Sequence, residues 1–467
     1  MRILKTIVNI LTITLIVGLT GCFNSQSVEA KLDSYIKAYV ELGKFSGSVL
    51  VAKDGKILLC KGYGMANYEH DIPNTPQTKF RLASITKQFT AMAVMQLQEQ
   101  GLLSVNDTLS KYIPDYPSGN KITIHHLLTH TSGVPNVTAF PESERKKIKP
   151  HTLEQLIERF KLKPLDFKPG EKHSYSNSGY ILLSYIIEKA SGKKYETVLK
   201  ENIFTPLNMI NSGYDKSSTV IKNRASGYSM SGDELINASY IDMSYPAGAG
   251  ALYSTVEDLY LWDQALYSEK LLSDELRATV FAPHSIMHQD DPDSSSYGYG
   301  WCIGKLHNRN ITEHAGGIDG FSTDICRYPD EKVCVIVLSN CNHFKASKIA
   351  QGLAAIVFRE KYELPKKHIA ISINPTIYDQ YVGKYKIDEN LVIGIIKEGN
   401  QIFAQPSNPS KPVPSANQSK LELLPESDIE FFHKTVDAQI SFIKDETGKV
   451  TKLILHDGKD RVGTKIE

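Results

Sequence analysis

A serine and a lysine stand three positions apart, in Ser84-Ile85-Thr86-Lys87, at the head of an apolar stretch. Side chains three apart share one face of a helix, and a residue at the helix start lies at the positive end of its dipole. A serine hydroxyl becomes a nucleophile when a base removes its proton, and desolvation lowers the pKa of a lysine enough for that task. The spacing predicts Ser84 as nucleophile and Lys87 as its base.

The Ser-x-x-Lys pattern also has an ordinary explanation, an N-capping serine followed by a solvated lysine. The residues that follow favour the catalytic interpretation, because the stretch up to Gln100 has almost no polar face. A helix that is apolar nearly all round is buried in its domain. A solvated Lys87 is hard to accommodate on such a helix.

A second segment, Tyr175-Ser176-Asn177, lies between Pro169-Gly170 and a further apolar stretch. Tyrosine relays a proton when nearby cations lower its pKa, and an asparagine amide both donates and accepts hydrogen bonds. We therefore expect Tyr175 to transfer protons and Asn177 to orient a substrate amide. By itself this segment is equally compatible with a core tyrosine and a turn asparagine.

A third segment, His314-Ala315-Gly316-Gly317, precedes a strand-like run. Consecutive glycines let a backbone come close to a ligand. Such a strand can offer the Gly317 N–H to an oxyanion, opposite the N–H of Ser84. The alternative is a glycine turn with an exposed histidine.

Histidines and cysteines give no metal pattern. His126 and His130 are four apart, as on a zinc-protease helix, but Leu127 stands where that helix needs glutamate. The cysteine spacings match no zinc pattern either, so we expect neither metal nor cofactor.

Cys326 and Cys334 are equally far from Asp330 in a proposed turn, and this predicts that they face each other across a hairpin, where they could oxidise.

The segments that must position these residues can be located from periodicity and turn signals. Helices are predicted at 32–40, 85–100 and 180–190, each followed by a glycine. Strands 49–52 and 57–60 flank Asp54-Gly55, a pair typical of two-residue hairpin turns. Strands return at 322–327 and 332–338. The pattern predicts an α/β fold in which helices flank an antiparallel sheet, with a mostly helical insertion between about 85 and 300.

Beyond residue 381 the chain changes character, because short β-like runs alternate with tight turns. The runs are 391–396, 401–404, 420–424, 430–433, 439–443 and 449–456. Several short strands at such spacing predict a small antiparallel barrel or sandwich.

The N-terminus reads as an export signal. Arg2 and Lys5 precede an apolar run from Ile7 to Val17, too short to cross a bilayer, and then Leu19-Thr20-Gly21-Cys22. This ending resembles the bacterial lipoprotein cleavage site, in which the cysteine is acylated, although an ordinary cleavage site shares its small residues. We expect an extracytoplasmic protein attached to a membrane through Cys22.

The chain has 53 basic and 52 acidic residues. With so little net charge, it gives no electrostatic reason to expect nucleic-acid binding.

Together the three segments occur in the order and spacing of one family. The chain resembles the serine β-lactamase-like hydrolases, close to the class C β-lactamases, the D-alanyl-D-alanine carboxypeptidases and related esterases and D-peptidases. The motifs that carry this resemblance are Phe80–Lys87, His126–Gly133, Pro169-Gly170 before Tyr175–Asn177, and Tyr299-Gly300-Trp301.

The resemblance implies an acylated Ser84, proton transfer by Lys87 and Tyr175, substrate orientation by Asn177, and an oxyanion hole made by the N–H groups of Ser84 and Gly317. Together with the N-terminal pattern and the change in character near residue 366, it predicts a domain layout: a signal peptide at 1–21, a tether at 22–30, a hydrolase domain at 31–361, a linker at 362–376 and a β-domain at 377–467. The last of these resembles a lipocalin-like appendage.

One departure from the family bears on the substrate. Family β-lactamases usually carry Lys-Thr-Gly where this chain has His314-Ala315-Gly316. A titrating imidazole would replace a fixed cation, so binding of a substrate carboxylate should weaken between about pH 6 and 8. We expect hydrolysis of an amide, ester or lactam bond, favouring a D-amino-acid peptide or ester, with Gly316 and His314 beside the substrate. The alternative is a catalytically silent sensor of penicillin or cell-wall fragments.

Overall fold

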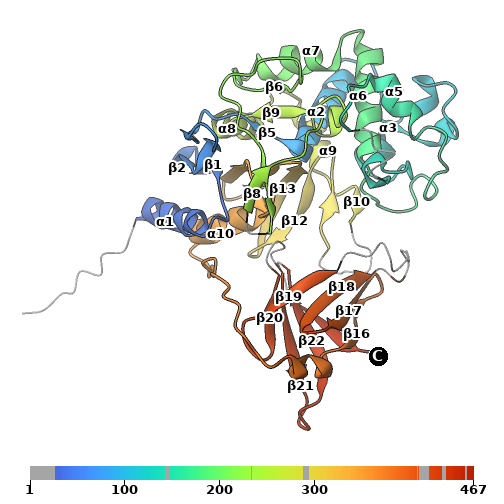
Figure 1. Cartoon of the computed structure of the whole chain (residues 1–467). Helices are drawn as coiled ribbons and strands as arrows, with labels where there is room; N and C mark the ends of the chain where they lie inside the picture. Colours follow the sequence, from blue (N-terminus) through green and yellow to red (C-terminus); the bar gives the residue numbers. More distant parts are fainter. Residues whose placement is uncertain are drawn as a thin grey trace, which may run out of the picture.

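The computed structural model describes residues 27–141, 147–232, 234–287, 294–407, 409, 420–433, 438–457 and 460–466. The signal peptide and Cys22 expected from the sequence lie outside these residues. The described chain forms an α/β unit followed by a β-barrel (Figure 1). In the described ranges, no helix has both the length and the apolarity that a bilayer crossing requires.

An eight-stranded antiparallel sheet forms the frame of the α/β unit, in the order β10-β11-β12-β13-β14-β15-β1-β2. Its strands are β1 (Gly47–Lys53), β2 (Lys56–Tyr63), β10 (Ser285–Ile286), β11 (Ser296–Tyr297), β12 (Cys302–Leu306), β13 (Arg309–Ile318), β14 (Phe321–Tyr328) and β15 (Val333–Ser339). The first and last parts of the unit meet in this sheet, because β1 pairs with β15 from Gly47↔Ser339 to Lys53↔Val333. The predicted hairpin at Asp54-Gly55 is confirmed as the turn between β1 and β2.

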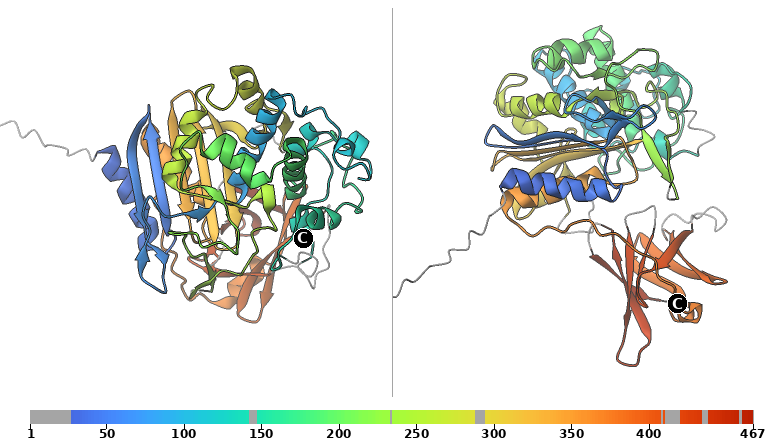
Figure 2. Two further views of the ribbon diagram at one scale, coloured as in Figure 1. Left: turned by 90° about the horizontal axis from the view of Figure 1, so that it is seen from above. Right: turned by 60° about the vertical axis from the view of Figure 1, so that its left-hand side comes forward.

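Each face of the sheet has its own hydrophobic core. Helices α1 (Val28–Glu41) and α10 (Ala346–Phe358) cover one face, and the remaining helices lie on the other (Figure 2, right). The second group includes α2 (Thr86–Glu99), α3 (Ile124–Leu128), α5 (Leu153–Glu158), α6 (Asn177–Ser191), α7 (Tyr195–Leu199), α8 (Val256–Ala265) and α9 (Asp274–Val280). The predicted α/β fold with a mostly helical insertion is confirmed.

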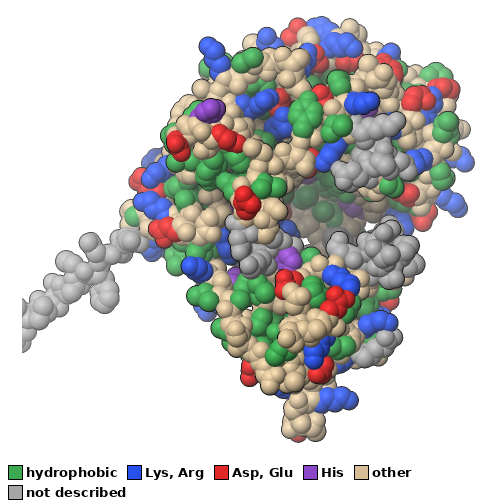
Figure 3. Space-filling model, in the orientation of Figure 1, with side chains coloured by type: hydrophobic (Ala, Val, Ile, Leu, Met, Phe, Trp, Pro, Cys, Tyr) green, Lys and Arg blue, Asp and Glu red, His purple; other side chains and the backbone are tan. Residues whose placement is uncertain are grey.

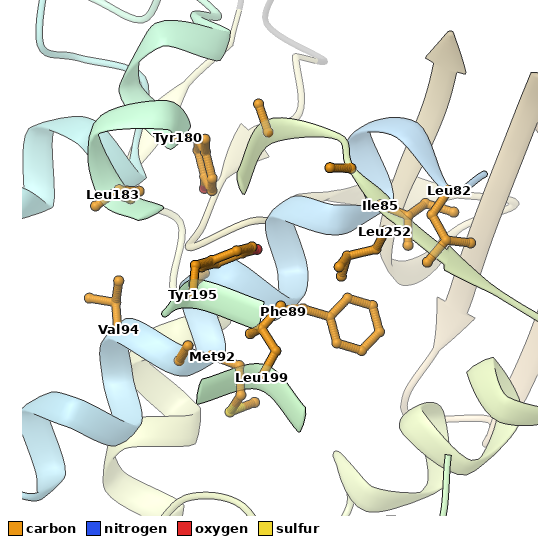
Figure 4. Packing of buried hydrophobic residues seen from close by; sticks show 14 of the residues in the cluster. Leu82, Ile85, Phe89, Met92, Val94, Tyr180, Leu183, Tyr195, Leu199 and Leu252 are labelled. Atoms are coloured by element: carbon orange, nitrogen blue, oxygen red, sulfur yellow. The ribbon is translucent and has the colours of Figure 1, made fainter. Parts of the chain in front are cut away.

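Helix α2 runs through the middle of the larger core, as its lack of a polar face predicts. Ile85, Phe89 and Val94 are fully buried. They pack among side chains of α6, α7 and β9 (Leu252–Ser254), as Figure 4 shows for Leu183, Leu199 and Leu252. Gly101 then ends the helix at φ +70°, a conformation that favours glycine. Ser84 and Lys87 are therefore mounted on a rigid element.

The expected pairing of Cys326 with Cys334 is wrong by one residue. Four residues, 329–332, form the β14–β15 turn, so Cys326 lies opposite Val335 and Arg327 lies opposite Cys334. Because successive strand residues point to opposite faces, Cys326 packs in the α1–α10 core and Cys334 in the α2 core. Both are free thiols. The predicted pairing assumed that Asp330 is the central residue of the turn, which requires a turn with an odd number of residues.

The C-terminal unit is a closed antiparallel barrel in sequential strand order. Its strands are β16 (Gly383–Asp388), β17 (Leu391–Glu398), β18 (Gln401–Ser407), β19 (Leu421–Pro425), β20 (Glu430–Phe432), β21 (Gln439–Lys444), β22 (Val450–His456) and β23 (Asp460–Lys465). Side chains fill its interior: Tyr381 stacks on Phe442 with 4.1 Å between ring centroids, and Phe431 packs against both. Residues 360–374, which carry no helix or strand, connect it to α10.

Candidate active site

Ser84 is held by a short sheet and a strained residue. β5 (Phe80–Arg81) pairs with β9, and the Leu82 N–H donates to the Leu252 carbonyl at 2.8 Å. Ala83 then adopts φ +48°, a left-handed conformation that is costly for a residue with a Cβ. Ser84 follows in a single 3₁₀ turn, Ala83–Ile85, that leads into α2. The hydroxyl is half-buried at the head of the helix, as the sequence predicts.

Lys87 lies one turn further on, and its side chain has no exposed surface. Its Nζ donates to Ser84 Oγ at 3.1 Å, to Asn177 Oδ1 at 2.8 Å and to the Ala249 carbonyl at 2.9 Å. All three acceptors are neutral, and no ion pair involves Lys87 within the described ranges. Burial therefore lowers the pKa of Lys87 well below its usual value. A neutral Lys87 amine keeps two N–H donors, for Asn177 Oδ1 and the Ala249 carbonyl, and its lone pair can then accept the Ser84 proton.

Asn177 is the first residue of α6 and is fixed on both sides of its amide. Its Oδ1 accepts from Lys87, and its Nδ2 donates to Thr138 Oγ1 at 2.9 Å. Its backbone N–H donates to Asn136 Oδ1 at 3.1 Å. One amide hydrogen is left over, which is the donor available to a substrate.

Tyr175 covers the same pair of residues from the other side. Lys87 Nζ lies 4.8 Å from the centre of its ring, and its phenol interacts with the Ser84 hydroxyl. Burial raises the pKa of Tyr175, which leaves the phenol protonated at neutral pH. A protonated phenol beside Ser84 can hand a proton to a leaving group.

Strand β13 approaches the nucleophile at Gly316. A Cβ placed on this residue would lie 2.3 Å from the Leu82 carbonyl oxygen and 3.1 Å from Ser84 N, so only glycine fits without displacement. The next residue, Gly317, faces outward, and a Cβ there would meet nothing within 4 Å. The strand thus runs beside the Ser84 N–H, as an oxyanion site made by Ser84 and Gly317 requires.

His314 does not have the character expected from the sequence. Its side chain is 4% exposed, and its Nε2 is hydrogen-bonded to the Tyr297 hydroxyl at 2.9 Å. Burial and the nearby Lys87 lower the pKa of His314 to about 3. The imidazole is therefore neutral at physiological pH, and the expected loss of its charge between pH 6 and 8 does not occur. Family β-lactamases usually have a lysine cation where this chain has His314. The histidine that replaces it is neutral, and it does not act as a cation that titrates near pH 7.

A group of aromatic rings packs around Tyr175. His130 is 4.3 Å from Tyr175 and 4.7 Å from Tyr297 between ring centroids, and its Nδ1 accepts from the Ser176 N–H at 3.1 Å. It thereby fixes the backbone next to Tyr175. The supporting residues Asn136 and Thr138 were missed, because a short polar stretch after Gly133 gives no signal of which amide it will hold.

The histidines near this site serve as hydrogen-bonding groups. His126 Nδ1 accepts from the Thr123 N–H in a capping box at the start of α3. His125 bonds to the Tyr299 hydroxyl at 2.8 Å. Within the described ranges, no group of three or more histidine, cysteine or acidic side chains is placed to hold a metal ion.

The arrangement can perform acyl transfer. It combines a serine on a helix head, a desolvated lysine beside it, a protonated tyrosine and a strand N–H that faces the same hydroxyl. On an antiparallel sheet flanked by helices, this combination defines the β-lactamase class of serine hydrolases.

The chain belongs to the Beta-lactamase family, whose sequence profile matches residues 32–357. Residues 367–465 match a domain of unknown function, DUF3471. Penicillin-binding protein 4* of Bacillus subtilis is 29% identical over 455 residues, which cover 93% of this chain and 98% of that protein. The putative penicillin-binding protein PbpX of the same organism is 34% identical over 333 residues, covering 71% of this chain and 78% of that protein.

Solved structures share this fold. The octameric penicillin-binding protein homologue from Pyrococcus abyssi superposes with a TM-score of 0.64 at 28% identity, covering 93% of this chain and 99% of that one. A D-amino acid amidase from Ochrobactrum anthropi has the same fold at 21% identity, with a TM-score of 0.66 over 72% of this chain and 99% of that one.

Proposed function

We propose that this protein is an extracytoplasmic serine hydrolase that forms an acyl-enzyme on Ser84 and then hydrolyses it. The bond attacked is an amide, ester or lactam, and we favour a D-amino-acid peptide or ester as the natural substrate. The observation that carries the proposal is the contact of Lys87 Nζ with Ser84 Oγ at 3.1 Å in a buried setting.

The chemistry follows from the site. Lys87 takes the proton as Ser84 Oγ attacks the carbonyl carbon, and the N–H groups of Ser84 and Gly317 stabilise the oxyanion. Tyr175 supplies a proton to the departing amine or alkoxide. The Lys87 ammonium returns a proton to the Tyr175 phenolate, which restores the neutral amine. Water then attacks the acyl-enzyme, Lys87 accepts a proton from this water, and that proton passes to Ser84 Oγ as the acyl group leaves. The two B. subtilis relatives are named as penicillin-binding proteins, and this supports our proposal that a penicillin can acylate Ser84.

The preference within the substrate class rests on His314. Its imidazole is buried and neutral, so it offers no positive charge to a substrate carboxylate. We expect efficient turnover of neutral esters and amides, and weak binding of substrates whose recognition depends on a carboxylate.

Intact-mass spectrometry with a penicillin, a D-alanyl amide and a D-alanyl ester tests the proposal. The wild-type protein should gain the mass of the acyl group, and Ser84→Ala should not. Ser268→Ala, a change at an exposed serine after α8, should label like the wild type. Labelling that persists in Ser84→Ala would refute the nucleophile.

The same experiment separates an enzyme from a silent sensor. An enzyme releases more than one product molecule per protein, whereas a sensor stays acylated and releases none. We favour the enzyme because the site retains Lys87, Tyr175 and Asn177 around the serine, and a binder needs no such set.

We also propose that Cys22 carries a lipid that attaches the protein to a membrane on its periplasmic or cell-surface side. The support is the Leu19-Thr20-Gly21-Cys22 sequence after an apolar run. Metabolic labelling with a palmitate analogue should mark the wild type and not Cys22→Ser. Cys60→Ser serves as the control, and equal labelling of Cys22→Ser would exclude the anchor.

A further inference from the structure

His130 occupies a backbone position at which histidine is unusual. It follows α3 and its cap residue Thr129, and it adopts φ +59°. This left-handed conformation at the end of a helix is normally taken by glycine and sometimes by asparagine, because a Cβ is crowded there. Such strained residues persist only where their surroundings hold them, and they are concentrated at functional sites. The conformation of His130 therefore indicates a role for its side chain that glycine could not fill.

Two groups of His130 reach the same loop. Its carbonyl oxygen accepts from the Ser174 N–H at 2.8 Å, and its Nδ1 accepts from the Ser176 N–H at 3.1 Å. These two donors are the neighbours of Tyr175 on either side in the sequence. Residues 172–176 belong to no helix or strand, so their backbone N–H groups depend on partners of this kind. One histidine thus holds the backbone before and after Tyr175.

The imidazole of His130 also packs on the tyrosine ring itself. The ring centroids of His130 and Tyr175 are 4.3 Å apart, and the ring planes are inclined by 38°. Tyr180 from α6 and Tyr297 from β11 enclose the imidazole, with centroids 5.1 and 4.7 Å away. Because two separate elements hold the imidazole, it restrains the ring of Tyr175 as well as the backbone beside it.

His130 is not placed to react. Histidine side chains reach the surface at only a few places on the face shown in Figure 3, and His130 is 1% exposed. Because its Nδ1 accepts a hydrogen bond, the proton of the neutral ring is on Nε2, which is buried without a hydrogen-bond partner among the described residues. Burial and the nearby Lys87 hold the pKa of His130 well below its usual value. The ring therefore stays neutral and touches no substrate.

We propose that His130 is a positioning residue that aligns Tyr175 for proton transfer to the leaving group. The proposal rests on the proposed function, in which the Tyr175 phenol supplies that proton. The phenol interacts with the Ser84 hydroxyl, and the tyrosine ring lies 4.8 Å from Lys87 Nζ. A proton donor must lie within hydrogen-bond reach of the reacting atoms, and a misplacement of about 1 Å can cost roughly 100-fold in rate. Release of the loop at 174–176 would allow such a shift.

Two substitutions at position 130 separate the side chain from the backbone strain. Glycine and asparagine both tolerate a left-handed conformation. The Oδ1 of asparagine can take the place of Nδ1, so His130→Asn keeps an acceptor for the Ser176 N–H, whereas His130→Gly has none. His130→Phe fills the space without an acceptor, and it replaces His130→Gly if the glycine variant does not fold. His126→Asn is the matched control, because His126 Nδ1 accepts from the Thr123 N–H at the start of α3.

Hydrogen–deuterium exchange on the whole protein tests the contact without any substrate. The Ser176 amide should be protected in the wild type and in His130→Asn, and it should exchange about tenfold faster or more in His130→Gly. The amides of α10 should exchange alike in all three proteins, which shows that the change is local. Equal protection of Ser176 in all three proteins would show that Nδ1 does not hold this loop, and would overturn the proposal whether or not the protein is a hydrolase.

A double-mutant cycle with Tyr175→Phe tests the connection to catalysis. On a D-alanyl amide, we expect His130→Gly to lower kcat by about tenfold or more, His130→Asn by less than about threefold, and His126→Asn by less than about twofold. In the Tyr175→Phe background no phenol remains to be aligned, so His130→Gly should lower kcat less than about twofold further. Equal losses in both backgrounds would make the role of His130 merely structural and overturn the proposal. A wild type that does not turn over the amide would instead refute the proposed function.

Discussion

The Nζ atom of Lys87 lies closer to the side-chain oxygen of Asn177, at 2.8 Å, than to the hydroxyl of Ser84, at 3.1 Å. The amide therefore decides where the lysine points, and it does so without a charge. This neutrality keeps the pKa of Lys87 low, because a carboxylate at such a distance would favour the ammonium form.

Asn177→Asp tests this relationship. A carboxylate within about 4 Å of an amine raises its pKa by roughly 1–3 units. Lys87 must be neutral to act as base, so the acid side of the kcat/KM profile should move to higher pH by at least one unit. Thr138→Val removes the Nδ2 acceptor without adding charge and should lower kcat with the profile in place. An unmoved profile in Asn177→Asp would show that Lys87 is not the titrating base.

Two adjacent glycines provide a matched pair. Gly316→Ala forces a Cβ against the Leu82 carbonyl and Thr323 Oγ1, each 2.3 Å away, whereas Gly317→Ala projects into open space. Overpacking of this kind costs about 2 kcal/mol, and it would displace β13 from Ser84. We expect Gly316→Ala to lose thermal stability and at least 100-fold in kcat/KM, and Gly317→Ala to keep both. If the two variants behaved alike, Gly316 would not be the residue at which β13 lies against Leu82 and Ser84.

Tyr175→Phe should separate substrates by leaving group. A buried phenol with a raised pKa is a proton donor at neutral pH, and such transfer contributes roughly 10²–10⁴-fold to rate. We expect a loss of about 100-fold on amides and a much smaller loss on a nitrophenyl ester, whose leaving group needs no proton. Tyr185→Phe, on the same helix as Asn177, is the control. An equal loss on both substrates would point to a structural role.

The buried His314 predicts two pH effects. Its pKa is about 3 in the folded protein and about 6.5 when unfolded, so folded and unfolded states bind the same number of protons above pH 6.5. As the pH falls below 6.5, the unfolded state takes up a proton that the folded state excludes, so the free energy of unfolding decreases steadily toward pH 3. Thermal melts of His314→Gln should show a shallower decline with acid.

The second effect concerns the substrate. Since His314 stays neutral, Michaelis constants for carboxylate-bearing substrates should be constant between pH 6 and 8 in the wild type. A rise through that interval would mean that the imidazole is charged, and would restore the interpretation based on sequence alone.

Some residues of the site could be predicted from the sequence and others could not. Ser84 and Lys87 were predictable because one helical spacing and one apolar stretch define their geometry. The burial of His314 was not, because Tyr297 comes from a different strand and only the assembled sheet brings its hydroxyl to the imidazole. The cysteine register failed for a local reason, since the residue count of a turn is not marked in its sequence. Asn136 and Thr138 act through a loop whose path depends on tertiary packing.

The alternation along β13 has a consequence for engineering. His314 and Gly316 point inward, where larger side chains would disturb the packing, but Ala315 and Gly317, which alternate with them, face outward. Saturation libraries restricted to these two outward positions would vary the rim of the site while leaving the core intact. Positions 315 and 317 are therefore suitable for directed evolution that aims to change which acyl donors the site accepts.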